Sequence, residues 1–527
     1  AFLFIKMLYE YNRNKFLKQL IKNMKNTYWF LCLIFSFCLG CGINAQPTHS
    51  KSNLKVLFVG YDPAKPLPEM DRSAPGMMSK EAFTKEYPIR MPAFKKLLSE
   101  YFAQVQTMDC RDWKAANSNP YDVTIFDFRT TPLEAARTEK GADGKTKYIS
   151  ARYLPDNFSK PVIFISSTAD EMGRSIGLKL DWLCLCLDAN AHHINTQHSI
   201  FKGPLEKVTP TMEMKKTPDG IFHYTTGDKI PKEIPMWKVQ NVGYLENNNT
   251  RIGLVSRGNR FNESPDVEDI SSGVCTKDVG AVALGRHGNF FLWGFGASPV
   301  DMTDEAKKVF VNAVAYMKQF DGKIPIARKY NDRMATTDDV REIVANATKE
   351  KYEEYIKLIE EFNDYNAKEK KRIDEKKTSG QALTSSEEQS LIYLGHPEKI
   401  NAYEQFLKGI MGKFSAQFGT DAEAFQKYIT DNFGYIYCDP NGFYEYSIDE
   451  DVQSIGISNH SVKMLEKCVE MLKQNDRPDL ALRILKKYTT EGFETAKEWS
   501  DWLSKNKNKL FFTETDGYRF MINTYKG

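Results

Sequence analysis

The chain has 527 residues, enough for two or three domains of about 150 residues each. Its 41% hydrophobic and 27% charged residues are typical of a folded globular protein and exclude a disordered chain. The 72 basic and 69 acidic residues nearly balance, with no long basic block, which disfavours a nucleic-acid groove built on charge, and nine cysteines are too sparse for a disulfide scaffold.

Residues 24–45 have the pattern of a secretory signal peptide. Lys25 follows Met24, residues 29–39 are almost wholly apolar, and small and polar residues lead to Ala45. The apolar run is shorter than the ~20 residues that span a bilayer, so we expect export and not a permanent transmembrane helix. Residues 1–23 are interpreted as an upstream extension and are left out of the fold prediction.

Cys41 opens a second possibility for the mature N-terminus. Leu39, Gly40 and Cys41 resemble the lipobox of bacterial lipoproteins, in which the cysteine is acylated, although Cys38 stands where that pattern has leucine. Cleavage after Ala45 would give a periplasmic or secreted protein, and lipidation at Cys41 would give a membrane-anchored one. In both cases the chain meets the membrane only through its signal peptide or its lipid anchor.

The pattern of residues 46–325 predicts an α/β domain. Short apolar runs rich in β-branched and aromatic residues alternate with stretches of helical periodicity, which implies a mostly parallel sheet covered on both faces. The predicted strands are 54–60, 121–128, 161–166, 251–256, 280–284 and 290–295, with residues 285–289 as the turn between the last two. The predicted helices are 92–102, 173–187 and 304–318.

The composition changes after residue 325, and residues 326–527 are predicted to form an all-α C-terminal domain. Residues 338–377 are strongly charged with a thin apolar stripe, which indicates a solvated helix with many ion pairs. Helical periodicity returns at 462–472 and 480–488, and the last aromatic residues indicate a packed cap. We expect this domain to offer a surface for a protein partner.

Two segments resemble a known family. Residues 198–204 (HSIFKGP) are similar to the His-Pro-Ile-x-x-Gly segment of trehalose-utilisation (ThuA-like) proteins, and residues 280–294 with 311–314 resemble the closing hairpin and helix of that domain. The family belongs to the class I glutamine amidotransferase-like superfamily. Over about half of the chain, the resemblance implies a flavodoxin-like sheet and a carbohydrate context.

The chain departs from the amidotransferase pattern at the nucleophile. Amidotransferases carry a cysteine in Gly-x-Cys-x-Gly on a sharp strand–helix turn, with a histidine and a glutamate as its partners. Here the strand 161–166 runs into Ser167 without a cysteine, and the sequence around Cys275 lacks the second glycine. The triplet 396–398 (HPE) lies far beyond the sheet. We therefore expect no amidotransferase activity.

Polar residues at predicted strand ends and turns form the candidate pocket, because ligands of open parallel sheets bind at the carboxyl ends of the strands. Carboxylates, guanidinium groups and hydroxyls there could hold a polyhydroxylated or anionic small molecule. The alternative is that they are helix caps, loop ion pairs and turn residues. The candidates are Asp62, Asp127, Arg129, Ser167, Thr168, His198, Arg257, Arg286 and His287.

A second cluster brings thiols and imidazoles close together in the sequence, at Cys184, Cys186, His192 and His193. These are zinc-ligand types, but two cysteines two apart on the predicted helix 173–187 would point to different faces. We therefore interpret them as buried core thiols and capped histidines, and we expect neither a metal nor a cofactor.

The sequence favours an exported, non-amidotransferase ThuA-like binding or scaffold protein with a sugar-like ligand or a protein partner, and no nucleic acid. The alternative is a carbohydrate-active hydrolase or isomerase that uses Asp62, Asp127 and His198 as acid–base groups. The enzyme requires these carboxylates to converge across an open cleft. Separate ion pairs, or a filled cleft, favour binding or scaffolding.

Overall fold

The computed structural model describes residues 50–68, 80–140, 146–181, 183–218, 230–243, 251–330, 334–383 and 385–525. Residues 339–433 form one unit, which we call the insert unit. The described residues of 47–338 and 434–527 form the other, which we call the sheet unit. The last part of the chain therefore belongs with the α/β region, whereas the sequence predicted a single boundary near residue 325. The predicted signal peptide and Cys41 lie outside the described residues.

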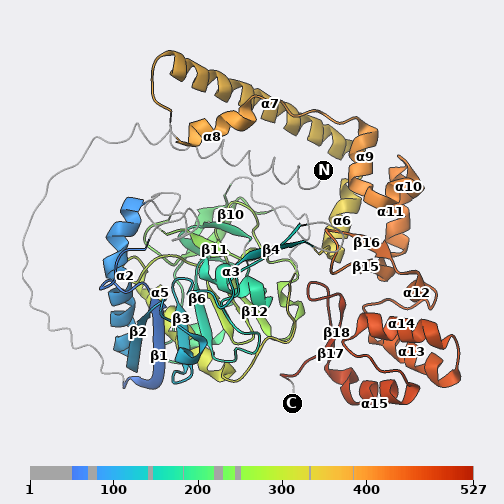
Figure 1. Ribbon diagram of the computed structural model, residues 1–527, viewed down its shortest axis with the longest axis horizontal. Coiled ribbons are helices and arrows are strands. Elements are labelled where there is room, and N and C mark those ends of the chain that lie inside the picture. The colour runs from blue at the N-terminus through green and yellow to red at the C-terminus, as the bar shows by residue number, and fades with distance from the viewer. Residues whose placement is uncertain are drawn as a thin grey trace, which may run out of the picture. The chain divides into compact units, whose positions relative to one another are not determined.

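The sheet unit is built on a mixed sheet of ten strands, which confirms the predicted α/β class (Figure 1). Its strand order is β2-β1-β3-β6-β14-β13-β12-β8-β10-β9. The first five run parallel: β2 Phe102–Asp109, β1 Ser52–Gly60, β3 Val123–Phe126, β6 Val162–Ile165 and β14 Phe290–Trp293. The other five pair antiparallel: β13 Val282–His287, β12 Val267–Gly273, β8 Asn190–His192, β10 Glu233–Lys238 and β9 Met212–Lys216.

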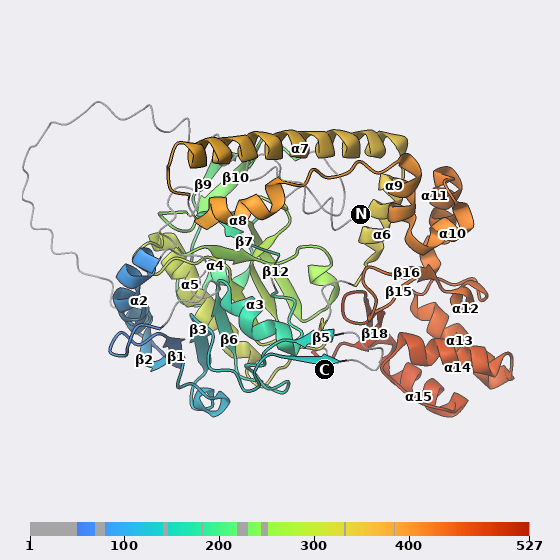
Figure 2. The same cartoon turned by 45° about the horizontal axis from the view of Figure 1, so that its top comes forward.

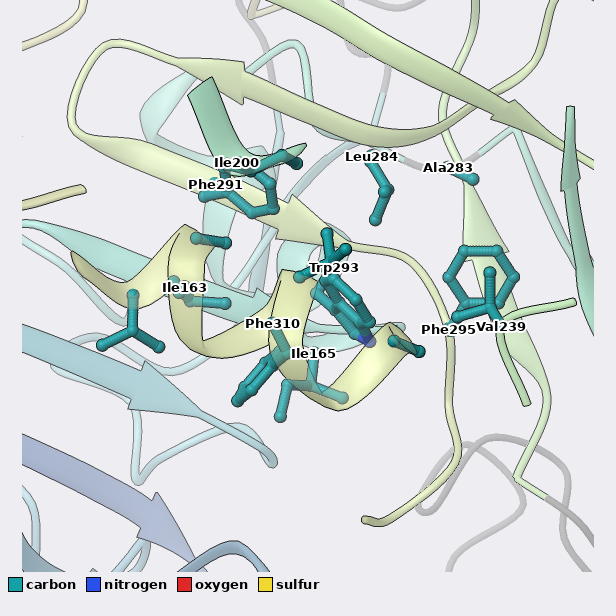
Figure 3. Packing of buried hydrophobic residues seen from close by; sticks show 14 of the residues in the cluster. Ile163, Ile165, Ile200, Val239, Ala283, Leu284, Phe291, Trp293, Phe295 and Phe310 are labelled. Atoms are coloured by element: carbon teal, nitrogen blue, oxygen red, sulfur yellow. The ribbon is translucent and has the colours of Figure 1, made fainter. Parts of the chain in front are cut away.

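Both faces of the central parallel strands β3, β6 and β14 are buried, and all of their residues except Thr124 are apolar. In β6, Ile163 and Ile165 pack into the core on one face, and Val162 and Phe164 pack into the core on the other. The first face is covered by α2 (Lys80–Tyr101), α4 (Ser199–Lys202) and α5 (Asp304–Met317). Figure 3 shows Phe310 of α5 beside Trp293 of β14, with ring centroids 5.1 Å apart.

The predicted closing hairpin is present as β13 and β14, but its turn is shorter than expected. β13 continues to His287, so only Gly288 and Asn289 separate the two strands. Gly288 has φ +59°, a left-handed conformation that glycine adopts without steric cost. Arg286 and His287, which were predicted to lie in the turn, are therefore strand residues.

The predicted helix 173–187 is wrong. α3 spans Thr168–Gly173, a 3-10 turn spans Arg174–Ile176, and Cys184–Leu187 form strand β7. Gly177 ends the helical segment in the left-handed conformation (φ 71°), as glycine commonly does after a helix. β7 pairs with β11 (Gly253–Val255) in a separate two-stranded sheet, so the predicted strand 251–256 exists but does not join the main sheet.

The insert unit is helical in its described residues. Its helices are α6 Thr337–Asn346, α7 Lys349–Thr378, α8 Ser385–Leu394, α9 Tyr403–Met411, α10 Ser415–Phe418 and α11 Ala422–Asp431. The predicted stretch 338–377 is two helices, because the Thr348 side chain accepts from the Lys351 N–H and caps the start of α7. Figure 2 shows α8 alongside α7, and Tyr352 of α7 packs against Tyr403 of α9 at 5.1 Å.

The residues from 434 onward correct the prediction of an all-α C-terminal domain. This region contains two antiparallel strand pairs, β15 Ile436–Cys438 with β16 Tyr446–Ile448 and β17 Leu510–Thr513 with β18 Arg519–Ile522. Its helices are α12 Glu450–Gln453, α13 Val462–Gln474, α14 Pro478–Tyr488 and α15 Ala496–Asn506. A buried ion cluster ties this region to the α/β region: the Lys179 ammonium lies 3.2 Å from Glu263 and 3.0 Å from Asp516.

None of the helices in the described part of the chain has the length and apolar character needed to cross a membrane.

Candidate functional site

The parallel half of the sheet has a topological switch point between β1 and β3. From β1 the chain passes through α2 to β2 on one side, and β3 then lies on the other side of β1. The loops that leave the carboxyl ends of β1 and β3 therefore diverge, and ligands of open α/β sheets bind at this place. Asp62 follows β1 here and Asp127 follows β3, as the sequence predicted.

Asp127 is the centre of a buried ion network, which we call the Asp127 centre (Asp127, Arg90, Arg251 and Glu86). The Asp127 carboxylate accepts from Nε and Nη2 of Arg90 at 2.6 and 2.8 Å and from Nη1 of Arg251 at 2.8 Å. Arg90 also pairs with Glu86 at 2.7 Å. The side chains of Asp127 and Arg251 are each 1% exposed. Two guanidinium groups therefore neutralise a carboxylate that water does not reach.

The space around the Asp127 centre is nearly filled. Residues of α2, among them Phe83 and Tyr87, close over it together with Tyr61 and Phe128, leaving about 10 Å³. That volume is roughly one water molecule. The Arg251 guanidinium lies over the Phe128 ring, 4.4 Å from its centroid, and the Tyr61 and Phe128 rings are 4.6 Å apart. The described residues thus form a packed centre at the switch point and not an open cleft.

The other carboxyl-edge candidates serve the local structure. The Asp62 carboxylate accepts from the Ala64 N–H at 2.9 Å and so caps its own turn. The Thr168 hydroxyl donates to the Asp127 carbonyl at 3.0 Å. Burial raises the pKa of Glu171, although the charges of Arg129 and Arg251 and a hydrogen bond with Ser167 oppose the rise.

Ser166 lies at the sharp bend between β6 and α3. Ser166 has φ 54°, a left-handed conformation that is uncommon for a residue with a side chain and that concentrates at functional bends. Its hydroxyl is fully buried and donates to the Ile252 carbonyl at 2.8 Å. The sharp bend is thus present, but its hydroxyl proton is directed to the backbone and not to a base.

His198, Arg286 and His287 lie at the opposite edge of the sheet. β14 runs parallel to β6 and β13 runs antiparallel to β14, so the last residues of β13 lie where the parallel strands begin. The sequence placed all nine candidates in one pocket, and this grouping is wrong, because a strand's direction decides the edge to which its end belongs.

The opposite edge has its own cluster, the Glu268 cluster (Glu268, His198, Arg286 and Tyr316). Glu268 of β12 accepts from Arg286 Nε at 2.7 Å, from the Tyr316 hydroxyl at 2.8 Å and from His198 Nε2 at 3.4 Å. Burial by itself raises the pKa of Glu268, but these bonds lower it to about 2. The Glu268 side chain is 30% exposed, so water reaches this carboxylate.

An open groove lies beside the Glu268 cluster, between α4 and α5. It has a volume of about 420 Å³, and Tyr316 lines it together with residues that include Ser199, Lys202 and Gln319. His198 caps the first turn of α4, because its ring nitrogen accepts from the Ile200 N–H. The segment that carries the family resemblance therefore forms one wall of this groove.

The last two candidates are His287 and Arg257. His287 is fully buried, its Nδ1 accepts from the Lys179 N–H at 3.0 Å, and its Nε2 lies 3.7 Å from Asp266. Burial lowers the pKa of His287. Arg257 directly follows Ser256, which forms a bridge to Val282 at the start of β13.

The prediction of free core thiols at Cys184 and Cys186 is wrong, because the two form a disulfide. On strand β7, residues two apart point to the same face, whereas on the predicted helix they would diverge. Burial, and then the neighbouring His193, lower the pKa of His192 to about 3. The described residues hold no group of three or more His, Cys, Asp and Glu side chains placed to bind a metal ion.

Sequence reasoning missed the partners that define each cluster. Arg90 lies within a helix, Arg251 was predicted as a strand residue, and Glu268 and Tyr316 had no motif around them. The one available signal was the charge of Arg90 and Arg251 within otherwise apolar patterns, since a buried charge needs a partner.

The sheet unit is thus an α/β unit with a neutralised centre at its switch point and a half-exposed carboxylate cluster beside a groove. No protein-family model, no curated protein and no solved structure matches the chain.

Proposed function

We propose that the chain is an exported, ThuA-like protein with a flavodoxin-like parallel half, without amidotransferase activity, that acts as a binding or scaffold protein. The Asp127 centre carries this proposal. A carboxylate that two buried guanidinium groups neutralise, in a space for one water molecule, is not available as a general acid or base. The backbone bond of the Ser166 hydroxyl argues in the same direction.

The groove beside the Glu268 cluster is the place we propose for a small ligand. Its volume of about 420 Å³ is within the range of small-molecule sites. Ser199, Lys202 and Gln319 offer donors for hydroxyl and carboxylate oxygens, and Tyr316 offers the edge of a ring. This chemistry suits a sugar or a sugar acid, which is the ligand class that the family resemblance implies.

The enzyme alternative needs Asp62, Asp127 and His198 in one cleft. Asp62 and Asp127 follow strand ends at one edge of the sheet, whereas His198 contacts Glu268 at the other edge. The geometry therefore favours binding over hydrolysis or isomerisation. A protein partner remains part of the proposal, since the insert unit has an open groove of about 410 Å³ that Arg341, Val344 and Ile429 help to line.

Export is the remaining part of the proposal and depends on residues 24–45. Cleavage after Ala45 places the protein in the periplasm or outside the cell, and acylation of Cys41 keeps it at a membrane. The mass and N-terminal sequence of the protein recovered from cells distinguish the two, because acylation adds lipid to Cys41.

A thermal-shift screen of the purified chain against sugars, sugar acids and divalent metals tests the binding proposal. A ligand at 100 times its dissociation constant stabilises the folded chain by about 2.7 kcal/mol, and we expect this for a sugar or sugar acid, with no product formed. The double variant Lys202→Ala and Gln319→Ala should lose the shift. Asp62→Asn, at the other edge, is the matched control and should keep it.

Two results would contradict the proposal. Release of a hydrolysed or isomerised sugar, abolished by Asp62→Asn, would establish the enzyme. The absence of any shift across the panel would remove the small ligand and leave the scaffold function.

A further inference from the structure

Strand β9 (Met212–Lys216) lies at one end of the ten-stranded sheet, beside β10 (Figure 2). Met212 and Met214 are 39% and 61% exposed, so both are large apolar residues that face solvent in the described part of the chain. Both lie on the face of β9 that also carries the exposed Pro235 of β10, since Met214 pairs with Pro235. An exposed edge with apolar side chains is a template for pairing with another strand.

The hydrogen bonds of β9 show which main-chain groups face the open edge. The Thr217 N–H donates to the Lys232 carbonyl at 2.8 Å, continuing the ladder in which Lys215 pairs with Ile234 and Glu213 with Met236. Main-chain groups of odd-numbered residues therefore point toward β10. Successive residues in a strand alternate, so the N–H and C=O of Met212 and Met214 point away from β10.

Charge selects one register if two copies of β9 pair antiparallel. Two residues that oppose each other in an antiparallel ladder either both direct their N–H and C=O groups toward the partner strand or both direct them away from it. Even-numbered residues of one β9 can therefore oppose only even-numbered residues of the other, and odd-numbered residues only odd-numbered ones. When Met214 opposes Met214 of the second copy, Glu213 opposes Lys215 on both sides of the axis. A shift by two residues along one strand places Glu213 opposite Glu213, or Lys215 opposite Lys215.

We propose that β9 is a self-complementary docking strand that pairs antiparallel with β9 of a second copy of this chain, about a two-fold axis at Met214. The two Glu213–Lys215 pairs then occupy non-hydrogen-bonded positions, where opposed side chains are closest. On the other face, the two Met214 side chains oppose each other between the Pro235 residues of the two copies, and each Met212 opposes Lys216 of the second copy.

Glu213 and Lys215 already form an ion pair within a single copy of β9. The Lys215 ammonium lies 3.3 Å from the Glu213 carboxylate of the same strand, and the two side chains are 32% and 64% exposed. The Lys215 ammonium also donates a hydrogen bond to Asn190 Oδ1 at 2.9 Å. Pairing adds a second carboxylate beside each ammonium without burying either charge. A two-fold interface repeats each contact, so every favourable or unfavourable pair counts twice.

Sedimentation equilibrium of the purified chain over a wide concentration range tests this pairing. We expect a reversible dimer. Glu213→Lys and Lys215→Glu should each raise the dimer dissociation constant at least about tenfold, because like charges then oppose each other twice. The double variant restores opposite charges in the same register and should restore the dimer. Protection of the Met212 and Met214 amides from hydrogen exchange should rise with protein concentration.

The other edge of the sheet provides the matched control. Gln106 is an exposed residue of β2, and Gln106→Lys introduces a lysine at that edge without changing β9. We expect this variant to dimerise like the wild-type chain. Three outcomes would overturn the proposal. The wild-type chain stays monomeric at every concentration, the double variant does not regain the dimer, or the dimer is lost only in Gln106→Lys. Circular dichroism of every variant establishes that it is folded.

Discussion

The Asp127 centre and the Glu268 cluster are similar in composition and opposite in exposure. Each is a carboxylate surrounded by donors that include arginine, but the Asp127 side chain is 1% exposed and the Glu268 side chain is 30% exposed. A buried charge must be paired by protein groups, because water cannot replace a lost partner. At the Glu268 cluster, water can take the place of a lost protein partner, so similar chemistry has different consequences at the two sites.

Removing the buried carboxylate is expected to have the largest effect. Asp127→Ala leaves Arg90 and Arg251 charged in a space that water does not fill, and should lower the free energy of unfolding by about 3–5 kcal/mol. Urea denaturation measures the loss. The triple variant Asp127→Leu, Arg90→Met and Arg251→Met removes all three charges and should recover much of it. If the triple variant is less stable than Asp127→Ala, the loss in the free energy of unfolding comes from packing and not from unpaired charge.

The half-exposed carboxylate should matter less. Glu268→Gln keeps the size of the side chain and loses its charge, so it should lower the free energy of unfolding by about 1–2 kcal/mol in the same urea experiment. Tyr316→Phe removes one of the three donors and is the milder control. A loss as large as that of Asp127→Ala would mean that water does not compensate at this edge, and the contrast between the two sites would fail.

Acid titration sharpens the contrast within strand β12. The pKa of Glu268 is lowered from 4.5 to about 2, so its contribution is complete above pH 4.5 and is lost as the pH falls toward 2. Burial raises the pKa of the neighbouring Asp269 from 3.8 to about 6, so stability falls as the pH rises from 3.8 through 6. Unfolding measured across pH 2–7 should lose the first dependence in Glu268→Gln and the second in Asp269→Asn. Identical profiles in both variants would contradict these assignments.

The smallest effect is expected at Asp62. This residue shares the carboxyl edge with Asp127, but its carboxylate caps an exposed turn. Asp62→Asn keeps an oxygen that can accept from the Ala64 N–H, so the free energy of unfolding should change by no more than about 0.5 kcal/mol. A loss of several kcal/mol on urea denaturation would show that Asp62 belongs to the buried network.

Much of the local structure followed from the sequence, and the exceptions have physical reasons. β1, β3 and β6 were predicted because strands buried on both faces contain nearly continuous apolar runs, such as Val56–Val59 in β1. β2 was missed, because an edge strand carries exposed residues such as Gln104 and Gln106 and here it starts directly after α2. β7 was predicted as a helix, because a short apolar run does not distinguish the two states until its partner β11 is known.

The candidate site followed only as a set of residues at strand ends and turns. Asp62, Asp127 and Thr168 were placed at the carboxyl edge correctly, since that depends only on where strands end. His198 and Arg286 were grouped with them wrongly, since that depends on strand direction. The disulfide of Cys184 and Cys186 likewise depends on whether those residues form a strand.

The order of residues along the chain was sufficient to determine the α/β class, the apolar strands and the closing amphipathic helix, because these depend on periodicity within a dozen neighbouring residues. The partners of Asp127 and Glu268, and the placement of the last residues with the sheet, were decided only by tertiary structure. Arg251 meets Asp127 and Asp516 meets Lys179 across long stretches of sequence, and no local pattern records which distant charges will be buried together.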